Sequence, residues 1–260
     1  MSDFLEVAID AARQAGRLLL DLRGSRLNIE KKGKVDLVTD ADRRSEDLIR
    51  KIISENFPDH QFIAEEGTES KSDSEYRWLV DPLDGTTNYT HGFPIWCVSI
   101  ALLKRGDITA GCIYNPSLDE CFTAETGWGA YLNADKISVS GTEKLDDALL
   151  ATGFPYDIRE TDDDNLREFT AFYKQAQAVR RAGAAALDLA YVACGRFDGF
   201  WEFKLSPWDI AAGILMVTEA GGRATSYSGD RYDIYKGELL ASNGLIHERM
   251  AEILREVRRK

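Results

Sequence analysis

The chain has 260 residues, 44% of them hydrophobic, which is enough for one large core or for two closely packed halves. Its formal net charge of −12 argues against a surface that binds nucleic acid or an anionic membrane, because both depend on basic patches. No apolar run approaches the roughly 18 residues of a membrane span, and the first residues lack the pattern of a signal peptide. We therefore expect a cytoplasmic protein without a membrane segment.

The first half of the chain predicts two helices followed by a sheet. Apolar residues recur at helical spacing from Phe4 to Leu20, and again from Leu48 to Ile53 after the stretch VTDADRRSED. From Gln61 the pattern changes to short apolar runs bounded by turns, namely QFIA, WLV, PIWCVSIALL, ITAGCIY and ECFTAE. These runs predict an antiparallel meander.

After about Thr142 the predicted strands and helices alternate. ALLATG, AVRRAG, GFWEF, RATS and ELLAS are typical of strands, whereas LREFTAFYKQA, AAALDLAYVAC, PWDIAAGILMVTEA and the C-terminal segment are typical of helices. We therefore expect an N-terminal α+β half over residues 1–141 and a C-terminal α/β half over residues 142–260. Because no stretch resembles a linker, the halves are predicted to form one compact structural unit.

The segment WLVDPLDGTTNYTHGFP concentrates acidic side chains where a buried strand is predicted to end. Asp81 ends that strand and Asp84 lies just beyond it, in a loop, while Glu65 follows the preceding strand QFIA. No lysine or arginine occurs from Leu79 to Leu103. Proline restrains φ and glycine permits a turn, so both aspartates can point into one small volume beside the Leu83 carbonyl.

Crowded carboxylates must share either protons or cations. Hard divalent ions such as Mg²⁺ take oxygen ligands, and this segment offers almost nothing else. A shared proton of the aspartic-protease kind would require acid pH and is the weaker explanation. The remaining alternative is a plain turn, since Asp, Pro and Gly are common turn residues.

Two further acids lie at predicted helix starts. Asp42 follows Thr39 by three residues and Asp209 follows Ser206 by three, and both arrangements match a capping box. Helix capping alone would explain them. An acid in a first helical turn also lies where backbone N–H groups attract phosphate, so capping and function are compatible.

Together, WLVDPLDGTTNYTHGFP, FIAEEG, LVTDAD and SPWDIAAGILMVTEAGG resemble the inositol monophosphatase family of Mg²⁺-dependent, lithium-sensitive phosphatases. The similarity runs from about Leu5 to the C-terminal helix, and the segment TGFPYDIRETDDDN resembles bacterial and archaeal members more than animal ones. The resemblance implies the layered αβαβα sandwich of the inositol monophosphatase and fructose-1,6-bisphosphatase type. It also implies a homodimer and two or three Mg²⁺ ions per subunit.

The resemblance assigns the metal ligands residue by residue. It implies that Glu65, Asp81 and the Leu83 carbonyl hold the first ion. Asp81, Asp84 and Asp209 match the second site, and Glu65 with waters would hold a weaker third ion.

The resemblance also assigns catalytic and substrate positions. The residues that match catalytic positions are Asp42, Thr86 and Glu65, and the first two match the pair that orients the attacking water. The residues that match substrate contacts are Asp84, Gly85, Thr86, Gly183, Ala185, Glu202 and Asp209. Among these, Glu202 matches a contact to substrate hydroxyls. Arg180 and Arg181 lie just before Gly183, and we interpret both as part of a solvent-exposed face.

The expected function is Mg²⁺-dependent hydrolysis of inositol 1-phosphate by direct attack of water on the phosphate monoester. Alternatives in the same superfamily are phosphatases for fructose 1,6-bisphosphate, a 3′-phosphonucleotide or histidinol phosphate. A non-catalytic regulatory protein with the same fold is a further alternative, although no metal acid is lost. A two-metal nuclease is disfavoured by the acidic composition and the lack of a basic, aromatic-lined groove.

Overall fold

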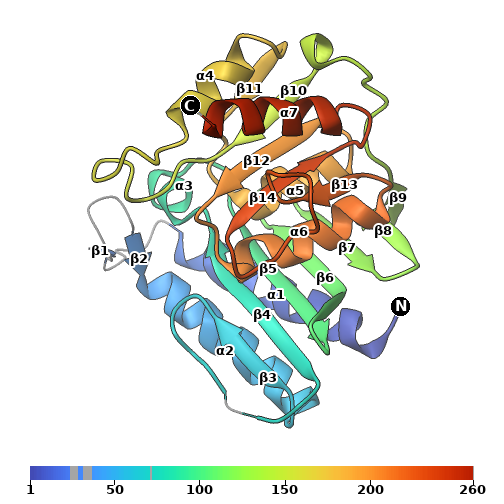
Figure 1. The fold of residues 1–260 in the computed structure, drawn as a ribbon. Helices are drawn as coiled ribbons and strands as arrows, with labels where there is room; N and C mark the ends of the chain where they lie inside the picture. Colours follow the sequence, from blue (N-terminus) through green and yellow to red (C-terminus); the bar gives the residue numbers. More distant parts are fainter. Residues whose placement is uncertain (24–28, 32–36, 71, 260) are drawn as a thin grey trace.

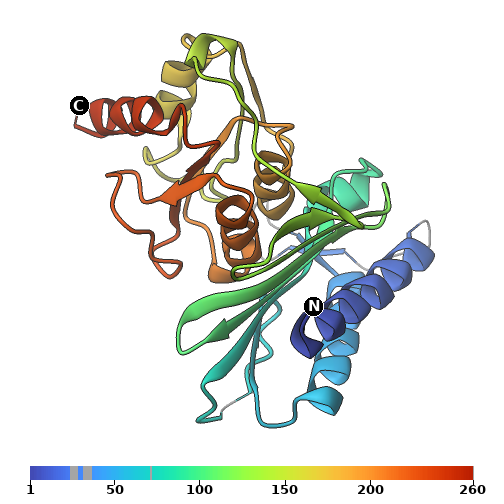
Figure 2. The ribbon, with the colours of Figure 1, turned by 90° about the vertical axis from the view of Figure 1, so that its right-hand side faces the viewer.

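The computed structural model describes residues 1–23, 29–31, 37–70 and 72–259. Helices and sheets alternate in five layers, as Figures 1 and 2 show from two sides. A helix pair covers a first sheet, a second helix pair separates this sheet from a second one, and a third pair covers the far face. The expected layered αβαβα sandwich is confirmed.

The first layer consists of α1 (Asp3–Leu22) and α2 (Asp40–Asn56). Both helices start at a side-chain cap: the hydroxyl of Ser2 accepts the Leu5 N–H, and Thr39 and Asp42 form a capping box. A short ribbon of β1 (Ile29–Lys31) and β2 (Leu37–Thr39) precedes α2. The apolar faces of the two helices are buried against the first sheet, as their periodicity predicts.

The first sheet has seven strands in chain order: β3 (Gln61–Ala64), β4 (Tyr76–Asp84), β5 (Cys97–Lys104), β6 (Asp107–Asn115), β7 (Glu120–Glu125), β8 (Gly129–Leu132) and β9 (Asp135–Ile137). The meander from β4 to β9 is antiparallel, as predicted. The prediction was wrong for the first pair, because β3 and β4 are parallel. The connection between them is much longer than a hairpin turn. It lets the chain return to the end of the sheet at which β3 begins, so that β4 can run in the same direction.

A second correction concerns the end of β4. The loop predicted around Asp84 is a bulged continuation of the strand, which pairs with β5 through Asp81 and Ser99 and then through Asp84 and Cys97. Because β4 has one residue more than β5 between these pairs, the bulge accommodates the proline that a regular ladder would exclude. The short helix α3 (Thr86–His91) follows directly.

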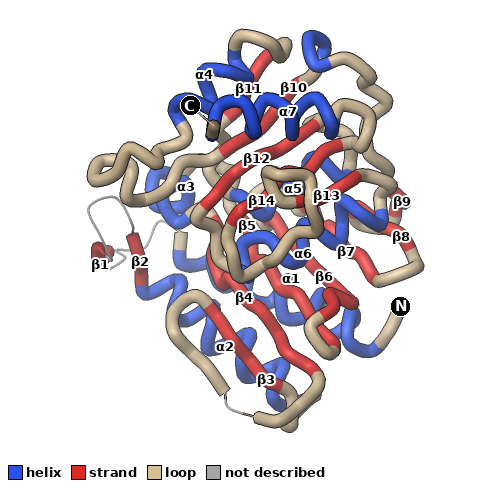
Figure 3. Tube along the Cα trace, viewed as in Figure 1, coloured by secondary structure: helices blue, strands red, loops and turns tan. Residues whose placement is uncertain are grey.

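The second sheet has five strands in the order β11 (Ala178–Arg180), β10 (Leu149–Thr152), β12 (Gly199–Phe203), β14 (Glu238–Ser242) and β13 (Arg223–Thr225). A short 3-10 turn, η1 (Leu145–Asp147), leads into it. The first three strands are parallel and β14 runs against β12, which fits the predicted alternation of strands and helices (Figure 3).

Four helices flank this second sheet. The pair α5 (Ala185–Ala193) and α6 (Pro207–Glu219) lies between the sheets and is apolar on nearly all sides, because it packs on both of them. The pair α4 (Leu166–Tyr173) and α7 (His247–Arg258) covers the outer face. Buried side chains from both sheets form one cluster around α5 and α6. The boundary at residue 141 stays a prediction.

In the described part of the chain, no helix combines the length and apolar character needed to cross a membrane.

Candidate active site

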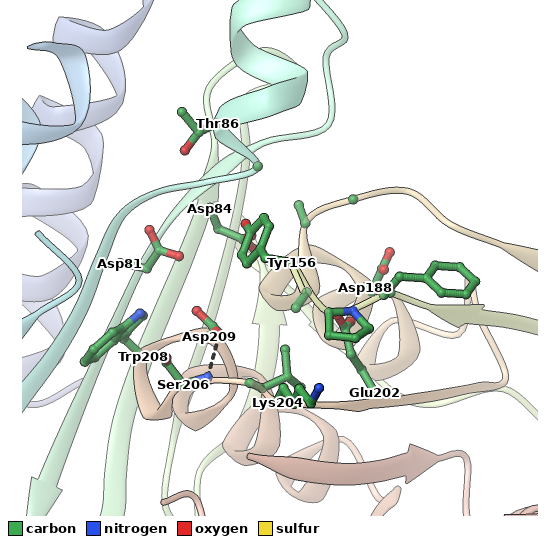
Figure 4. Close-up of a pocket in the computed structure, with 18 of the residues that line it drawn as sticks. Asp81, Asp84, Thr86, Tyr156, Asp188, Glu202, Lys204, Ser206, Trp208 and Asp209 are labelled. Atoms are coloured by element: carbon green, nitrogen blue, oxygen red, sulfur yellow. Dashed lines mark hydrogen bonds between the residues drawn. The ribbon is translucent and has the colours of Figure 1, made fainter. Parts of the chain in front are cut away.

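A cavity of about 220 Å³ opens where the end of β4 meets the first turns of α5 and α6. Glu65, Asp81, Asp84 and Asp209 line it, and we call these four residues the acid cluster. Figure 4 shows three of them, Asp81, Asp84 and Asp209, around the same space. The four acids come from three segments far apart in the sequence, so the fold brings them together.

The bulge of β4 presents two of the acids. Asp81 is buried, and its Oδ1 accepts the Leu83 N–H at 2.9 Å. Oδ2 of Asp84 accepts the N–H of Ala186, in the first turn of α5, at 2.8 Å. Backbone donors therefore fix both carboxylates, and one of these donors belongs to the second half of the chain.

The other two acids enter from different elements. Asp209 lies in the first turn of α6, where its Oδ2 accepts the Ser206 N–H at 2.7 Å and completes the predicted capping box after Pro207. Glu65 follows β3, and its N–H donates to the Val80 carbonyl at 3.2 Å. The capping role of Asp209 is therefore real, and it places the carboxylate in the pocket.

Burial raises the pKa values of Asp81, Asp84 and Asp209, and repulsion between carboxylates adds to the effect at Asp81 and Asp209. Burial is the largest cause for each: it raises the pKa of Asp84 to about 6, and it raises the pKa values of Asp81 and Asp209 well above their ordinary range. The charges of Glu65 and Asp84 raise the pKa values of Asp81 and Asp209 further. Without a cation, these buried carboxyl groups therefore keep their protons at pH values at which a carboxyl group exposed to water has lost its proton.

We expect the metal-free protein to lose stability as the pH rises from about 6.5 to about 8.5. Burial, with a smaller effect of Asp84, raises the pKa of the pocket residue Glu202 to about 8. Up to about pH 8 most of the folded protein keeps that proton, whereas the same carboxyl in the unfolded chain has lost it, so the fall should level off above about pH 8. The state that binds more protons is favoured at lower pH, so the melting temperature in the presence of a chelator should fall as the pH rises.

A buried histidine has the opposite effect on stability, but only below the pH range chosen for this measurement. Burial lowers the pKa of His247 to about 4, so this group increases stability as the pH rises toward its unfolded pKa of about 6.5 and has little effect above it. Glu202→Gln should show a shallower fall than the wild type in the same buffers. A melting temperature that is constant or rises from pH 6.5 to 8.5 would contradict the raised pKa of Glu202.

The acid cluster suits a hard divalent cation by its chemistry. Its donors are carboxylate oxygens, with the Leu83 carbonyl on the same wall, and these are ligand types that Mg²⁺ takes. Within the described residues, no three acidic, cysteine or histidine side chains are already placed to hold a metal ion together. Mg²⁺ usually keeps several waters and binds through one or two carboxylates, so acids around a shared space fit this ion better than they fit a closed zinc site.

Thr86 and Asp42 form a hydrogen-bonded pair at the edge of the pocket. The Thr86 hydroxyl lies 3.0 Å from Oδ1 of Asp42 and 3.1 Å from the Leu83 carbonyl, and it can donate its proton to either oxygen. Oδ2 of Asp42 accepts the N–H and the hydroxyl of Thr39 at 2.8 and 2.6 Å. Asp42 therefore caps α2 and also contacts Thr86, which remains able to accept a hydrogen bond from the pocket.

The first turn of α5 forms the wall that adjoins the bulge, to which the Ala186 N–H is bonded through Asp84. Gly183 and Ala185 line the pocket, and Gly183 has a φ of +90°, in the left-handed region that favours glycine. The side-chain amide of Asn88 in α3 donates to the carbonyls of Ile95 and Ala182 at 2.7 and 2.8 Å. This amide ties the segment after β4 to the approach to α5, so both walls keep their spacing.

Glu202 lies near the end of β12, on the side of the pocket away from Asp81 (Figure 4). Its carboxylate lies directly against Gly153, where an added methyl group would overlap it. Asp188 lies at the same end of the pocket (Figure 4). This end is therefore also rich in carboxylates, although it lies apart from the bulge.

The sequence motifs identified part of the pocket lining and missed the rest. Every residue assigned to metal, catalysis or substrate lines the pocket except Asp42, which reaches it through Thr86. Their roles stay predictions. Arg181 was interpreted as part of a solvated face, yet it lines the pocket, as do Lys204 and the exposed Tyr156.

Asp188 was also missed. It is buried, its Oδ1 has no hydrogen-bond partner, and burial together with the charge of Glu202 raises its pKa well above the ordinary range. The available signal was an aspartate inside the otherwise apolar helix AAALDLAYVAC. A buried acid with a perturbed pKa in a cleft is a candidate for a functional site.

Comparisons with known proteins give a consistent result. The model of the inositol monophosphatase family matches residues 1–259. The chain is 46% identical over 256 residues to an inositol-1-monophosphatase from Synechocystis sp., covering 98% of this chain and 89% of that protein. It is 42% identical over 250 residues to Nus factor SuhB from Pseudomonas aeruginosa, covering 94% and 92%. The solved inositol monophosphatase from Anabaena (Nostoc) sp. matches with a TM-score of 0.89 at 44% identity, covering 97% of this chain and 95% of that one.

Proposed function

The chain belongs to the inositol monophosphatase family, and we propose that it hydrolyses inositol 1-phosphate to inositol and phosphate, with Mg²⁺ as its metal. The observation that carries the proposal is that the acid cluster shares one pocket with the Thr86 hydroxyl and the first turn of α5. The proposal includes two or three ions per subunit, lithium sensitivity and a homodimer, which the family resemblance implies, and a cytoplasmic location, which the lack of a signal-peptide pattern suggests.

The acid cluster would hold the ions. We assign Glu65, Asp81 and the Leu83 carbonyl to one ion, Asp81, Asp84 and Asp209 to a second, and Glu65 with waters to a weaker third. Bound Mg²⁺ would supply positive charge that lowers the pKa of water and offsets charge on the phosphate and the leaving oxygen. Without that charge, the carboxylates would repel a phosphate dianion.

Thr86 and Asp42 would position the attacking water. While the Thr86 hydroxyl donates to Asp42, its lone pairs remain available for a proton of water in the pocket. Asp42 is buried and already accepts two hydrogen bonds from Thr39, so its orientation is fixed before substrate enters. The pair would set the direction of attack on phosphorus.

Backbone groups would bind the phosphate. The first turn of α5, which begins at Ala185 and lines the pocket, places the positive end of the helix dipole there, although its Ala186 N–H already donates to Asp84. Gly85, with a φ of +89°, lets the chain leave β4 in close contact with Gly183, whose carbonyl oxygen would lie 3.2 Å from a Cβ atom added to Gly85. A phosphate in the pocket beside this contact would lie near backbone groups from both halves of the chain.

A screen for phosphate release tests the function. With Mg²⁺ present, we expect hydrolysis of inositol 1-phosphate, and the comparison substrates are fructose 1,6-bisphosphate, glycerol 2-phosphate and a 3′-phosphonucleotide. Preference for the bisphosphate or the nucleotide would support the alternative phosphatases of the superfamily. Absence of release from every monoester would support the non-catalytic regulatory alternative, to which the likeness to a Nus factor also points.

Glu202 provides a specific prediction about the leaving group. Burial and, to a smaller extent, the charge of Asp84 raise the pKa of Glu202 in the metal-free pocket, and cations in the acid cluster would offset that charge and so favour the ionised form. An ionised carboxylate only accepts hydrogen bonds, so this side chain suits polyol hydroxyls. Glu202→Gln should lower kcat/KM for inositol 1-phosphate by roughly 10- to 150-fold, which corresponds to one hydrogen bond to a charged group of about 1.5–3 kcal/mol. Initial rates with inositol 1-phosphate and with a small aryl phosphate that lacks hydroxyls provide the measurement, and the aryl substrate should be nearly unaffected.

The matched control for this prediction is Glu238→Gln on the neighbouring strand β14. It changes the same chemical group outside the pocket, so both substrates should react at wild-type rates. Equal losses on both substrates in Glu202→Gln would instead place Glu202 among the residues that act on metal or phosphate. Wild-type rates on both substrates would show that Glu202 contacts neither the leaving group nor the phosphate.

A further inference from the structure

Three polar residues on one face of α2 each contact a different segment of the pocket wall. Asp42, Ser45 and Glu46 are buried and are spaced so that they share one side of the helix. Asp42 accepts from Thr86, and the Ser45 hydroxyl donates to the Pro82 carbonyl at 2.8 Å. These two contacts reach the segments on either side of Asp84. The third residue reaches the loop after β3.

Glu46 binds two backbone N–H groups of that loop. Its Oε2 accepts the Glu66 N–H at 2.8 Å and its Oε1 accepts the Thr68 N–H at 3.2 Å. Glu46 is only 3% exposed, which is rare for a glutamate and requires that its carboxylate be well satisfied. The residue next to the first of these N–H groups is Glu65, a member of the acid cluster.

Other hydrogen bonds of the loop join neutral backbone groups. The Glu65 N–H donates to the Val80 carbonyl at 3.2 Å, the Ala64 N–H to the Thr68 carbonyl at 3.1 Å and the Gly67 N–H to the Ala64 carbonyl at 3.3 Å. Hydrogen bonds to a charged acceptor are roughly twice as strong as those between neutral groups. The Glu46 carboxylate is therefore a major restraint on the backbone that carries Glu65.

We propose that Glu46 is a positioning residue that holds the backbone on either side of the turn after Glu65 and thereby sets the affinity of the pocket for Mg²⁺. The inference rests on the proposed function in one respect, the assignment of Glu65 as a metal ligand. Glu46 does not line the pocket, so it acts through the loop and not on substrate. The polar face of α2 thus supports the water-positioning pair, the bulge and the Glu65 loop from one rigid helix.

The test is calorimetric titration of Glu46→Gln with Mg²⁺ alone, without substrate. Glutamine has nearly the same size, but its amide replaces one acceptor oxygen with a donor that faces a backbone N–H. We expect Mg²⁺ binding to weaken by about 10- to 100-fold, the usual effect of losing a partner that orients a metal ligand. In steady-state assays, the Mg²⁺ concentration for half-maximal rate should rise by a similar factor, and kcat at saturating Mg²⁺ should recover.

Glu219→Gln is the matched control. The Glu219 carboxylate accepts the N–H groups of Gly127 and Gly129 at 2.9 and 2.8 Å, which is the same kind of contact in a loop away from the pocket. Its loss should lower the melting temperature without changing Mg²⁺ affinity. Should Glu46→Gln fail to fold, Glu46→Asp replaces it: the shorter carboxylate keeps its charge but cannot reach both N–H groups as well, and weaker Mg²⁺ binding is again expected.

Glu65→Gln, titrated in parallel, separates the inference from the function on which it rests. Weaker Mg²⁺ binding in both Glu65→Gln and the Glu46 variant supports both. Weaker binding in Glu65→Gln with wild-type affinity in a folded Glu46 variant overturns the positioning role alone. Wild-type affinity in Glu65→Gln overturns the ligand assignment and the positioning role together.

Discussion

Removal of divalent cations should abolish phosphate release from inositol 1-phosphate, and added Mg²⁺ should restore it. The acid cluster collects four carboxylates in one pocket, and the bulge segment that carries two of them has no lysine or arginine from Leu79 to Leu103. A metal contributes several kcal/mol of charge stabilisation to the transition state, and each 1.36 kcal/mol is a factor of ten, so we expect a loss on the order of 10³-fold or more. Phosphate release before chelation, after it and after Mg²⁺ is returned is the measurement.

Asp84→Asn tests the same assignment at one ligand. The amide keeps the size of the side chain and can still accept the Ala186 N–H, so the variant should fold. Its lost charge should weaken Mg²⁺ binding, which calorimetry detects, and should lower turnover at low Mg²⁺. Asp107→Asn, an exposed acid paired with Arg231, is the matched control and should behave as the wild type. Wild-type turnover of Asp84→Asn at low Mg²⁺ would remove Asp84 from the metal site.

Local sequence signals predicted most elements because each has a local cause. The period of apolar residues marked α1 and α2, and the Thr39 and Ser206 capping patterns placed the starts of α2 and α6. The parallel pairing of β3 with β4 was not predicted, since apolar runs reveal strands but not their relative direction. That direction depends on where the intervening chain runs, which is a tertiary property.

The helix α3 escaped prediction for a related reason. Its sequence TTNYTH is poor in strong helix formers. Left-handed glycines, Gly85 and Gly92, bound it at both ends, and Asn88 anchors it to the Ile95 and Ala182 carbonyls. Only the packed structure supplies these partners, so propensity alone favoured a loop.

The site was predictable where acids form a motif and unpredictable where they do not. Asp81 and Asp84 stand out because they flank a proline at the end of an apolar strand. Asp188 is a single aspartate in an apolar helix, outside any acidic motif, and Arg181 resembles a surface arginine, although both line the pocket. Glu46 carries no signal either, because its role depends on a loop twenty residues further along the chain.

Thr86→Ala should lower kcat for inositol 1-phosphate by roughly 10²- to 10⁴-fold with a smaller change in KM, which is the usual scale of positioned proton transfer. The substitution removes the hydroxyl that faces both Asp42 and the pocket and leaves the backbone of α3 in place. Steady-state kinetics at saturating Mg²⁺ separates this effect from weaker metal binding. Thr90→Ala is the matched control, because its hydroxyl donates to the Thr87 carbonyl within the same helix. Near wild-type turnover in Thr86→Ala would show that Thr86 does not position the attacking water.

Asp42→Asn decides whether the acid behind Thr86 acts in catalysis or only caps α2. As a cap alone, Asp42 would contribute about 1 kcal/mol to the free energy of unfolding and little to the rate. As the partner of Thr86, its charge keeps the hydroxyl proton directed away from the water, so the hydroxyl oxygen faces the pocket as an acceptor. The amide has only one acceptor oxygen for the three hydrogen bonds that Asp42 receives from Thr39 and Thr86. We therefore expect kcat to fall more than the melting temperature predicts, and normal turnover with a lowered melting temperature would restrict Asp42 to capping.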